Sequence, residues 1–214
     1  MERGKLIVLE GNEGVGKTTQ LEKVSAYLRE QGKEVISPRE PGGTPEGELI
    51  RSCLKHPDNH WLSSSRELVL FNAARAILVG RVIEPALAAG IWVAVDRYYP
   101  STIAYQGFAG KYSPIMELHH QIRDAIGDTR PDLTCILDAP VEVSIQRKNH
   151  EHATDRFQQK GAAYMEAVRD GYFWYAGDRI LYRENKILLD TASFGIEEVF
   201  HEIKKEIDNL LQVP

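Results

Sequence analysis

Short runs of consecutive apolar residues recur along the chain and alternate with stretches in which apolar residues return every three to four positions. The runs cover residues 5–10, 34–37, 91–96, 133–138 and 186–190. Each run is nearly continuous in hydrophobicity, which is typical of a strand buried on both faces of a parallel sheet. Because a helical pattern separates each run from the next, the sequence predicts an α/β fold with a five-stranded parallel sheet flanked by helices.

Cap and turn residues set the limits of the helices expected between these strands. Ser64 and Glu67 have the spacing of a capping box, and we expect Pro85 to interrupt the long helix that this box would open. The predicted helices cover about residues 17–31, 46–55, 64–89, 113–126, 140–148, 156–176 and 195–211. The last helix has a stripe of apolar residues that is expected to face the core. These are Ile196, Val199, Ile203, Ile207 and Leu210.

The chain has 214 residues, of which 43% are hydrophobic, and we expect a single domain over residues 1–214. The formal net charge of −5 argues against a protein that coats a nucleic-acid backbone, since such a protein carries a basic face. No apolar run is long enough for a signal peptide or a membrane span. Cys53 and Cys135 lack the spacing of a disulfide framework or a zinc site. The sequence predicts a soluble, cytoplasmic protein that binds neither membrane nor nucleic acid.

A glycine-rich segment joins the first predicted strand to the first predicted helix. Gly11, Gly16, Lys17 and Thr18 complete the pattern G-x-x-x-x-G-K-[ST], in which glycines let successive backbone N–H groups turn toward an anion. The positive end of the helix dipole adds to this attraction. Lys17 is expected to reach the outer phosphates of a nucleotide, and the Thr18 hydroxyl to ligate Mg²⁺. The residues expected to hold the nucleotide are Gly11, Asn12, Glu13, Gly14, Val15, Gly16, Lys17, Thr18 and Thr19.

The third predicted strand ends in Asp96-Arg97. A carboxylate at this edge of the sheet, beside the phosphate loop, is suited to hold a water bound to Mg²⁺, and the adjacent guanidinium is suited to bind a phosphate. Thr18 and Asp96 are therefore the predicted metal residues. The alternative is that Asp96 only caps the next turn and that Arg97 is solvated.

Several further motifs occur together in the order and spacing of one family. They are Glu40-Pro41-Gly42-Gly43-Thr44, Leu70-Phe71-Asn72-Ala73-Ala74-Arg75, Asp96-Arg97-Tyr98 followed by Ser101-Thr102-Ile103-Ala104-Tyr105-Gln106-Gly107, Arg130-Pro131-Asp132-Leu133, and Asp155-Arg156-Phe157. With these segments the chain resembles thymidylate kinases over essentially its whole length. The resemblance implies a three-layer P-loop kinase fold with a lid at about residues 147–160, where the polar residues 149–155 would form a mobile loop. It also implies ATP and dTMP as substrates, Mg²⁺ as cofactor, and a homodimer.

The resemblance assigns roles to individual residues at the acceptor end of the site. Phe71 would stack on the pyrimidine, Arg75 would donate to its carbonyl edge, and Thr102 would lie at the ring nitrogen. Tyr105 would pack beneath the sugar, and Glu13 would meet the sugar 3′-hydroxyl. The residues that would surround the acceptor phosphate are Arg51, Arg97 and Gln106. The predicted dTMP site is completed by Glu40, Pro41 and Ser101.

Each of these residues also has a purely structural interpretation. Phe71 lies at helical spacing from other apolar residues and would ordinarily be a core residue. Arg75, one turn later, favours the functional interpretation, because a guanidinium on that face is costly unless a planar polar group binds there. Glu13 and Glu40 could be solvated loop charges. His150 and His152 are interpreted as surface residues rather than metal ligands.

The resemblance predicts that the terminal phosphoryl group of ATP moves to the 5′-phosphate of dTMP. Because the acceptor oxygen is already anionic, catalysis is expected to consist of positioning, charge neutralisation and exclusion of water. The expected catalytic residues near the phosphates are Lys17, Asp96 and Arg97.

The sequence departs from related bacterial enzymes in the lid. Related enzymes carry several lid arginines that reach the transferring phosphoryl group, whereas Asn149 and Glu151 stand where two of them would align. The cations that flank the loop are therefore the candidates for this role, namely Arg147, Arg156 and Lys148. Arg147 is also expected to contact ATP.

Two other functions compete with this one. A deoxynucleoside kinase would share the phosphate loop and could use Glu40 as a general base, but the cations expected around the acceptor favour a substrate that already carries a phosphate. A nucleotide-dependent switch or binding module is disfavoured because the chain has no Asn-Lys-x-Asp motif for guanine. Since one methyl group in a pocket is worth about 1–3 kcal/mol, dUMP or a modified thymidylate stays an alternative acceptor.

Overall fold

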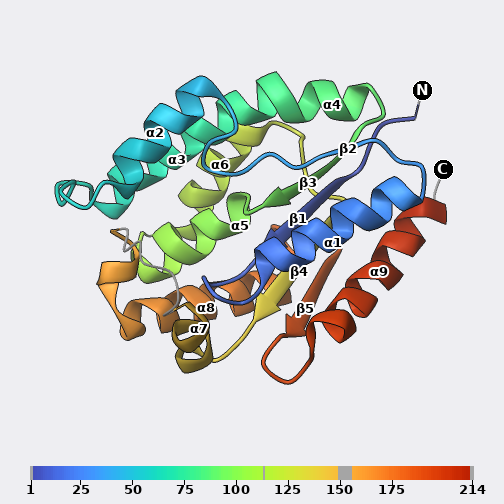
Figure 1. The fold of residues 1–214 in the computed structure, drawn as a ribbon. Helices are drawn as coiled ribbons and strands as arrows, with labels where there is room; N and C mark the ends of the chain where they lie inside the picture. The colour runs from blue at the N-terminus through green and yellow to red at the C-terminus, as the bar shows by residue number, and fades with distance from the viewer. Residues whose placement is uncertain (1, 113, 149–155, 213–214) are drawn as a thin grey trace.

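The computed structural model describes residues 2–112, 114–148 and 156–212 (Figure 1). Its centre is a five-stranded sheet in the order β2-β3-β1-β4-β5, in which each neighbouring pair of strands is parallel. The strands are β1 Leu6–Glu10, β2 Val35–Ile36, β3 Trp92–Asp96, β4 Leu133–Asp138 and β5 Lys186–Asp190. The predicted parallel sheet of an α/β fold is confirmed, and every apolar run contains a strand.

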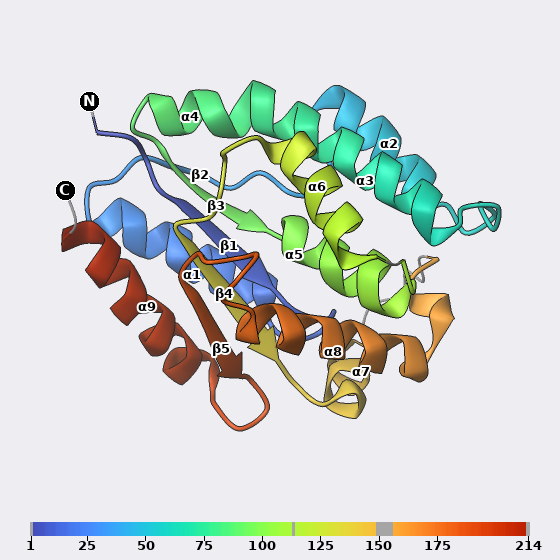
Figure 2. The ribbon, with the colours of Figure 1, turned by 180° about the vertical axis from the view of Figure 1, so that it is seen from behind.

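Helices cover both faces of the sheet and give the fold three layers (Figures 1 and 2). One face carries α1 Lys17–Glu30 and α9 Ile196–Gln212. The other carries α3 Ser64–Leu78, α4 Glu84–Ala88, α6 Ile115–Ile126 and α8 Ala162–Gly177. In β1, Ile7 and Leu9 join the core beneath the first pair of helices, whereas Leu6 and Val8 join the opposite core. All four side chains are fully buried, which explains the uninterrupted apolar run.

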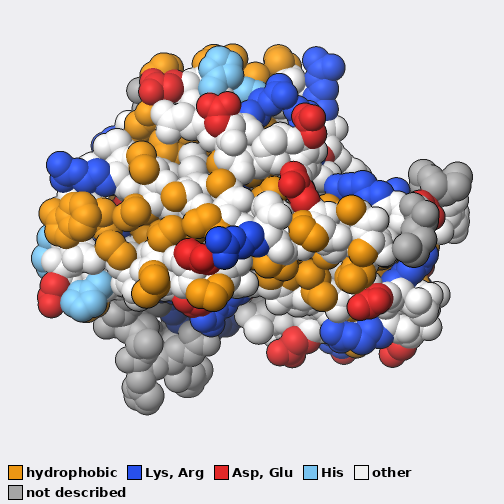
Figure 3. Space-filling view, turned by 90° about the horizontal axis from the view of Figure 1, so that it is seen from above, with side chains coloured by type: hydrophobic (Ala, Val, Ile, Leu, Met, Phe, Trp, Pro, Cys, Tyr) orange, Lys and Arg blue, Asp and Glu red, His pale blue; other side chains and the backbone are white. Residues whose placement is uncertain are grey.

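Three further helices lie near the ends of the strands. They are α2 Pro45–Lys55, α5 Tyr99–Thr102 and α7 Val141–Lys148. α2 packs against α3, and the two helices form part of the upper layer in Figure 1. Figure 3 looks down on this layer and shows hydrophobic side chains scattered among the charged ones. Leu49 of α2 is 72% exposed and Val69 of α3 is 63% exposed.

The register of the central strands brings acidic residues to one edge of the sheet. Leu9 of β1 pairs with Asp96, the last residue of β3, and Glu10 pairs with Ile136 of β4. The segments that follow β1 and β3 therefore leave the sheet side by side. In an open parallel sheet this carboxyl edge is where ligands bind.

The long helix predicted for residues 64–89 is divided differently from the expectation. Ser63 precedes α3 as its N-cap, and the side chain of Glu67 is buried in ion pairs, so the predicted capping box does not form. The helix widens into a π-helical turn at Val79–Ile83, and Pro85 lies in the first turn of α4, directly after this turn. A second π-helical segment, Ile103–Ala109, follows α5 and was not predicted.

The C-terminal third contains two further differences. The helix predicted to begin at residue 156 begins at Ala162, after a 3₁₀ turn at Gln158–Lys160 and Gly161 with φ of 79°. In α9 the middle of the apolar stripe is buried as predicted, but Ile196 is 55% exposed. The predicted loop at 149–155 lies outside the described residues. Within the described ranges, none of the helices combines the length and the hydrophobicity needed to cross a membrane.

Candidate nucleotide-binding site

The phosphate loop runs from Gly11 to Gly16, between β1 and α1, and is held by its glycines. Gly11, Gly14 and Gly16 have φ angles of 132°, 78° and 96°, which L side chains rarely adopt. A Cβ atom on Gly11 would overlap the carbonyl oxygen of Leu137, and one on Gly14 would overlap that of Ser144. The loop therefore packs directly on the backbone of the end of β4 and of α7, and these contacts explain why glycine is needed at both positions.

Lys17 is the first residue of α1, and its side chain lies back along the loop. Its ammonium group is buried and donates to the carbonyl oxygens of Gly11 at 3.1 Å and Asn12 at 2.7 Å. Burial, assisted by the positive charge of Arg97, lowers the pKa of Lys17 to about 7. A polyanion bound in the loop would stabilise the protonated ammonium, so the electrostatics of the site favour a phosphorylated ligand.

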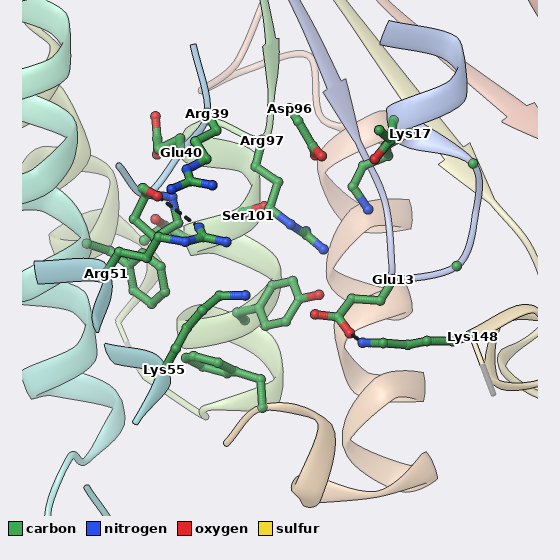
Figure 4. A pocket seen from close by; sticks show the side chains of 18 of the residues that line it. Glu13, Lys17, Arg39, Glu40, Arg51, Lys55, Asp96, Arg97, Ser101 and Lys148 are labelled. Atoms are coloured by element: carbon green, nitrogen blue, oxygen red, sulfur yellow. Dashed lines mark hydrogen bonds and ion pairs between the residues drawn. The ribbon is translucent and has the colours of Figure 1, made fainter. Parts of the chain in front are cut away.

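A cavity of about 570 Å³ opens beside this loop (Figure 4). It brings together most of the predicted site residues from segments far apart in the sequence. Its lining includes Glu13, Gly14, Gly16, Lys17, Thr18, Thr19, Glu40, Pro41, Arg51, Phe71, Asp96, Arg97, Ser101, Thr102, Tyr105, Gln106 and Arg147. The predicted residues outside this lining are Gly11, Asn12, Val15, Arg75 and Arg156.

Arg97 lies between the two ends of the cavity, and its side chain points toward Lys17 and Glu13 in Figure 4. Its Nη1 donates to the carbonyl oxygen of Gly11 at 3.1 Å, to Ser101 Oγ at 3.1 Å and to the hydroxyl of Tyr172 at 3.0 Å. The φ angle of Arg97 is 73°, a conformation that is unfavourable for a residue with a side chain. The alternative in which Arg97 is simply solvated is therefore wrong.

Phe71 and Arg75 lie one turn apart on α3 but have different surroundings. Phe71 lines the cavity and packs against Phe157 at 5.9 Å between ring centroids, so it is not a plain core residue. Arg75 is almost fully buried and donates to Glu40 Oε1 at 2.5 Å and to Asn72 Oδ1 at 2.9 Å. Arg75 thus stands behind Glu40, and Glu40 lines the cavity in its place.

Glu40 is not the solvated loop charge that the alternative interpretation supposed. Its side chain is buried, and Oε2 has no hydrogen-bond partner among the described residues. Burial raises the pKa of Glu40 to about 7, although the guanidinium of Arg75 acts in the opposite direction. Glu13 is likewise paired, since it forms an ion pair with Lys148 at the end of α7.

The three cations that flank the predicted lid loop are placed differently. Arg147 and Lys148 line the cavity, and Arg147 Nη2 donates to the carbonyl oxygen of Thr191 at 2.7 Å. Arg156 is buried outside the cavity lining, with Nη1 2.8 Å from Glu67 Oε1. Its placement does not support the predicted contact between Arg156 and the transferring phosphoryl group.

Sequence reasoning missed several residues of the site. Glu10 is completely buried behind Arg97, and Tyr172 of α8 lies beside it. Arg39 and Lys55 also line the cavity and point into it in Figure 4. Lys55 follows Arg51 by four residues, so the helical spacing of the predicted helix could have identified it. No comparable signal marks Tyr172, because its distance from the loop in sequence is large.

Thr18 and Asp96 fit the predicted Mg²⁺ in their chemistry. Both line the cavity, and Oδ1 of Asp96 is buried without a hydrogen-bond partner in the described structure. Such an oxygen can accept from a metal-bound water. Among the described residues, no group of three or more His, Cys, Asp or Glu side chains could hold a metal. Further ligands would therefore come from phosphate oxygens and water, which is common for Mg²⁺.

The fold and the site together define a P-loop nucleoside monophosphate kinase. A phosphate loop lies at one end of the cavity, and an aromatic ring with several arginines lies at the other. The family model for thymidylate kinase matches residues 9–203. The chain belongs to the thymidylate kinase family.

Curated relatives align with nearly the whole chain. A thymidylate kinase from Pseudomonas entomophila is 41% identical over 208 residues, which cover 97% of this chain and 95% of that protein. One from Pseudomonas putida (strain W619) is 44% identical over 205 residues, which cover 96% of this chain and 95% of that protein. One from Afipia carboxidovorans is 44% identical over 181 residues, covering 82% and 78%.

Proposed function

We propose that the protein transfers the γ-phosphoryl group of ATP to the 5′-phosphate of dTMP, giving ADP and dTDP. The observation that carries this proposal is that one cavity contains both the phosphate loop with Lys17 and a second end formed by Phe71, Arg51 and Arg97. Two anionic nucleotides bound end to end in this cavity would meet at Arg97.

The residues near Arg97 would act mainly by position and charge. The backbone of the phosphate loop and Lys17 would bind the ATP phosphates, and Arg97 would neutralise charge between donor and acceptor. An acceptor phosphate needs no general base, because its oxygen is already anionic. Thr18 and Asp96 would hold Mg²⁺, which supplies further neutralisation of the phosphate oxygens when bound. Arg147 and Lys148, rather than Arg156, are the proposed cations for the transferring group.

The acceptor end offers a complementary surface for a pyrimidine deoxynucleotide. The ring of Phe71 is proposed to stack on the base, and the Glu40–Arg75 pair to lie at its polar edge. Thr102 Oγ1 is buried without a hydrogen-bond partner in the described residues, and it would meet the ring nitrogen. Tyr105 would pack under the sugar, where a ribose 2′-hydroxyl would be unfavourable. The remaining acceptor contacts are proposed for Glu13, Pro41, Arg51, Ser101 and Gln106.

A coupled ATP assay with a panel of acceptors tests this function. We expect turnover with dTMP and little with thymidine, because the cations at the acceptor end, Arg51 and Arg97, favour a substrate that already carries a phosphate. Faster turnover with thymidine than with dTMP would contradict the proposal. Comparing dTMP with dUMP and 5-modified deoxyuridylates at the same concentration identifies the preferred base.

We also propose that the protein is a cytoplasmic homodimer that pairs through the surface of α2 and α3. This surface carries exposed apolar side chains, with Leu49 and Val69 the most exposed on the two helices. Cys53 and Cys135 are unpaired, which agrees with a reducing compartment. Analytical ultracentrifugation is expected to give the mass of a dimer for the wild type and of a monomer for Val69→Glu. A wild-type monomer at micromolar concentration would contradict the dimer.

A further inference from the structure

The carboxylate of Glu10 accepts hydrogen bonds from four donors, three in the segment that follows Arg97 and one in α8. Glu10 is the last residue of β1 and is completely buried. Its Oε1 accepts from the backbone N–H of Tyr98 at 2.7 Å and of Ser101 at 3.2 Å. Its Oε2 accepts from the hydroxyl of Ser101 at 2.7 Å and from the hydroxyl of Tyr172 at 2.8 Å. Both oxygens of this one carboxylate are thus used to hold the chain that follows β3.

Arg97 shares these partners. The same hydroxyl groups of Ser101 and Tyr172 that donate to Glu10 accept from Arg97 Nη1, at 3.1 Å and 3.0 Å. The guanidinium of Arg97 is therefore linked to Glu10 through two hydroxyl groups, with the carboxylate on the protein side and the guanidinium on the cavity side. Glu10 also accepts the backbone N–H of Tyr98, the residue directly after Arg97. This hydrogen bond holds the backbone next to the unfavourable conformation at Arg97.

A buried carboxylate contributes little to the stability of a fold. Removing such a charge from water has a large free-energy cost, and a well-packed apolar side chain would often stabilise the fold as well. Burial raises the pKa of Glu10, and the charge of Arg97 together with the hydrogen bonds opposes this effect. The hydrogen bonds of Glu10 are explained if they hold Arg97 in a conformation that the reaction needs. Strained backbone conformations persist only where the surrounding structure holds them.

We propose that Glu10 is a positioning residue for phosphoryl transfer, which fixes the guanidinium and the backbone of Arg97 at the junction of the two nucleotides. This inference rests on the proposed function, in which Arg97 contacts the phosphates. Glu10 itself does not line the cavity and would not touch either substrate.

The test is a double-mutant cycle between Glu10→Gln and Arg97→Met in the full-length protein, measured with ATP and dTMP. Glu10→Gln is expected to lower kcat/KM for the acceptor by about a hundredfold, the cost of misplacing a catalytic group by roughly 1 Å. The KM for ATP should change by less than about threefold, since the phosphate loop keeps its own contacts. In the Arg97→Met background, Glu10→Gln should lower kcat/KM by less than about threefold, because the group it positions is already gone.

Several outcomes would overturn the inference. If the effects of the two substitutions on kcat/KM multiply, or if Glu10→Gln raises the KM for ATP as strongly as that for the acceptor, Glu10 is a general structural residue. Glu184→Gln is the matched control, because Glu184 is another carboxylate that accepts from tyrosine hydroxyls, those of Tyr99 and Tyr175, without contacting Arg97. Its acceptor kcat/KM should stay within about threefold of wild type.

A second variant keeps the inference testable if Glu10→Gln does not fold. Tyr172→Phe removes one of the two hydroxyl links and retains the ring, and it should lower acceptor kcat/KM about tenfold, an effect that disappears in the Arg97→Met background. An unchanged kcat/KM in Tyr172→Phe would then overturn the inference. Wild-type turnover of dTMP reports separately on the proposed function, and if another monophosphate proves to be the better acceptor the cycle is measured with that one.

Discussion

Glu13 in the phosphate loop and Lys148 at the end of α7 form an ion pair, and the two side chains lie side by side on the phosphate-loop side of the cavity (Figure 4). The two side chains are 25% and 17% exposed, so the pair is largely shielded from solvent. The ion pair joins the phosphate loop to the end of the helix that precedes residues 149–155. If Glu13 also meets the acceptor sugar, as the family resemblance implies, Lys148 is held near the junction of donor and acceptor.

This placement gives a prediction for the cation that acts on the transferring phosphoryl group. Lys148→Gln or Arg147→Gln should lower kcat by about tenfold or more, with a change in KM of less than about twofold, because the lost charge acts mainly in the transition state. Steady-state kinetics with ATP and dTMP measure this. Lys205→Gln is the control, since Lys205 is exposed on α9 and its ion pair with Glu202 lies outside the cavity lining. Wild-type kcat in both lid variants would contradict the prediction.

We expect the ion pair between Arg156 and Glu67 to stabilise the folded protein rather than to act on the transferring phosphoryl group. Glu67 is buried in α3 and accepts from Arg156 Nη1 at 2.8 Å, from Lys160 Nζ at 3.1 Å and from Gln106 Nε2 at 2.9 Å. Glu67→Gln leaves the buried guanidinium without its anion and should lower the free energy of unfolding by about 3–5 kcal/mol. Urea unfolding measures this loss.

A surface ion pair provides the comparison for Glu67. Arg81 and Glu46 are 2.6 Å apart, and their side chains are 63% and 42% exposed. Glu46→Gln should cost less than about 1 kcal/mol, since solvent screens the pair. Equal losses in the two variants would mean that the burial of Glu67 and Arg156 has no special role.

The sequence was sufficient to predict the sheet and most of the cavity. The central strands β1, β3 and β4 are enclosed on both faces, so their apolar runs reflect only local burial, and the phosphate loop has a fixed spacing with a direct physical cause. The motifs around Phe71 and Arg97 also identified residues that line the cavity, because their order matched one family throughout. In each of these cases, the residues that form the sequence pattern are within a few positions of the structural feature they predict.

The features that were missed depend on contacts between distant segments. Glu67 has the spacing of a capping residue, yet its carboxylate binds Arg156, 89 positions away in the chain. Glu10 ends an apolar strand, and only the register of β1 against β3 shows that it lies behind Arg97. Arg75 carries the expected charge on the expected helix, but its pairing with Glu40 puts it outside the cavity lining. Single-sequence patterns do not encode such pairings.

Lys55 leads to a prediction about acceptor binding. It lies one helical turn after Arg51, and both side chains point into the cavity from α2, on the side opposite Lys17 (Figure 4). A charged hydrogen bond to a phosphate is worth about 1.5–3 kcal/mol, so Lys55→Gln should raise the KM for dTMP about tenfold or more. The KM for ATP should not change. An unchanged KM for dTMP at low ionic strength, where charge effects are largest, would contradict a role for Lys55 in binding.

Glu40 should make the stability of the protein depend on pH. Its pKa is raised by burial to about 7 in the folded state, against an ordinary value of 4.5, while the charges of Arg75 and Glu10 act in opposite directions on it. The folded protein therefore retains a proton on Glu40 that the unfolded chain releases between these two values. The stabilisation is complete below the unfolded pKa and is lost as the pH rises to about 7.

Unfolding free energies of wild type and Glu40→Gln at pH 5, 6, 7 and 8, roughly spanning this titration, measure the effect. Relative to Glu40→Gln, which has no titrating group at this position, the wild type should lose up to about 1.4 kcal/mol per pH unit between pH 5 and 7 and little above that. The difference between the two proteins removes the contribution of other groups, including Glu10. If the ion pair with Arg75 outweighed burial, the pKa of Glu40 would be depressed, and the wild type would show no such loss over this range.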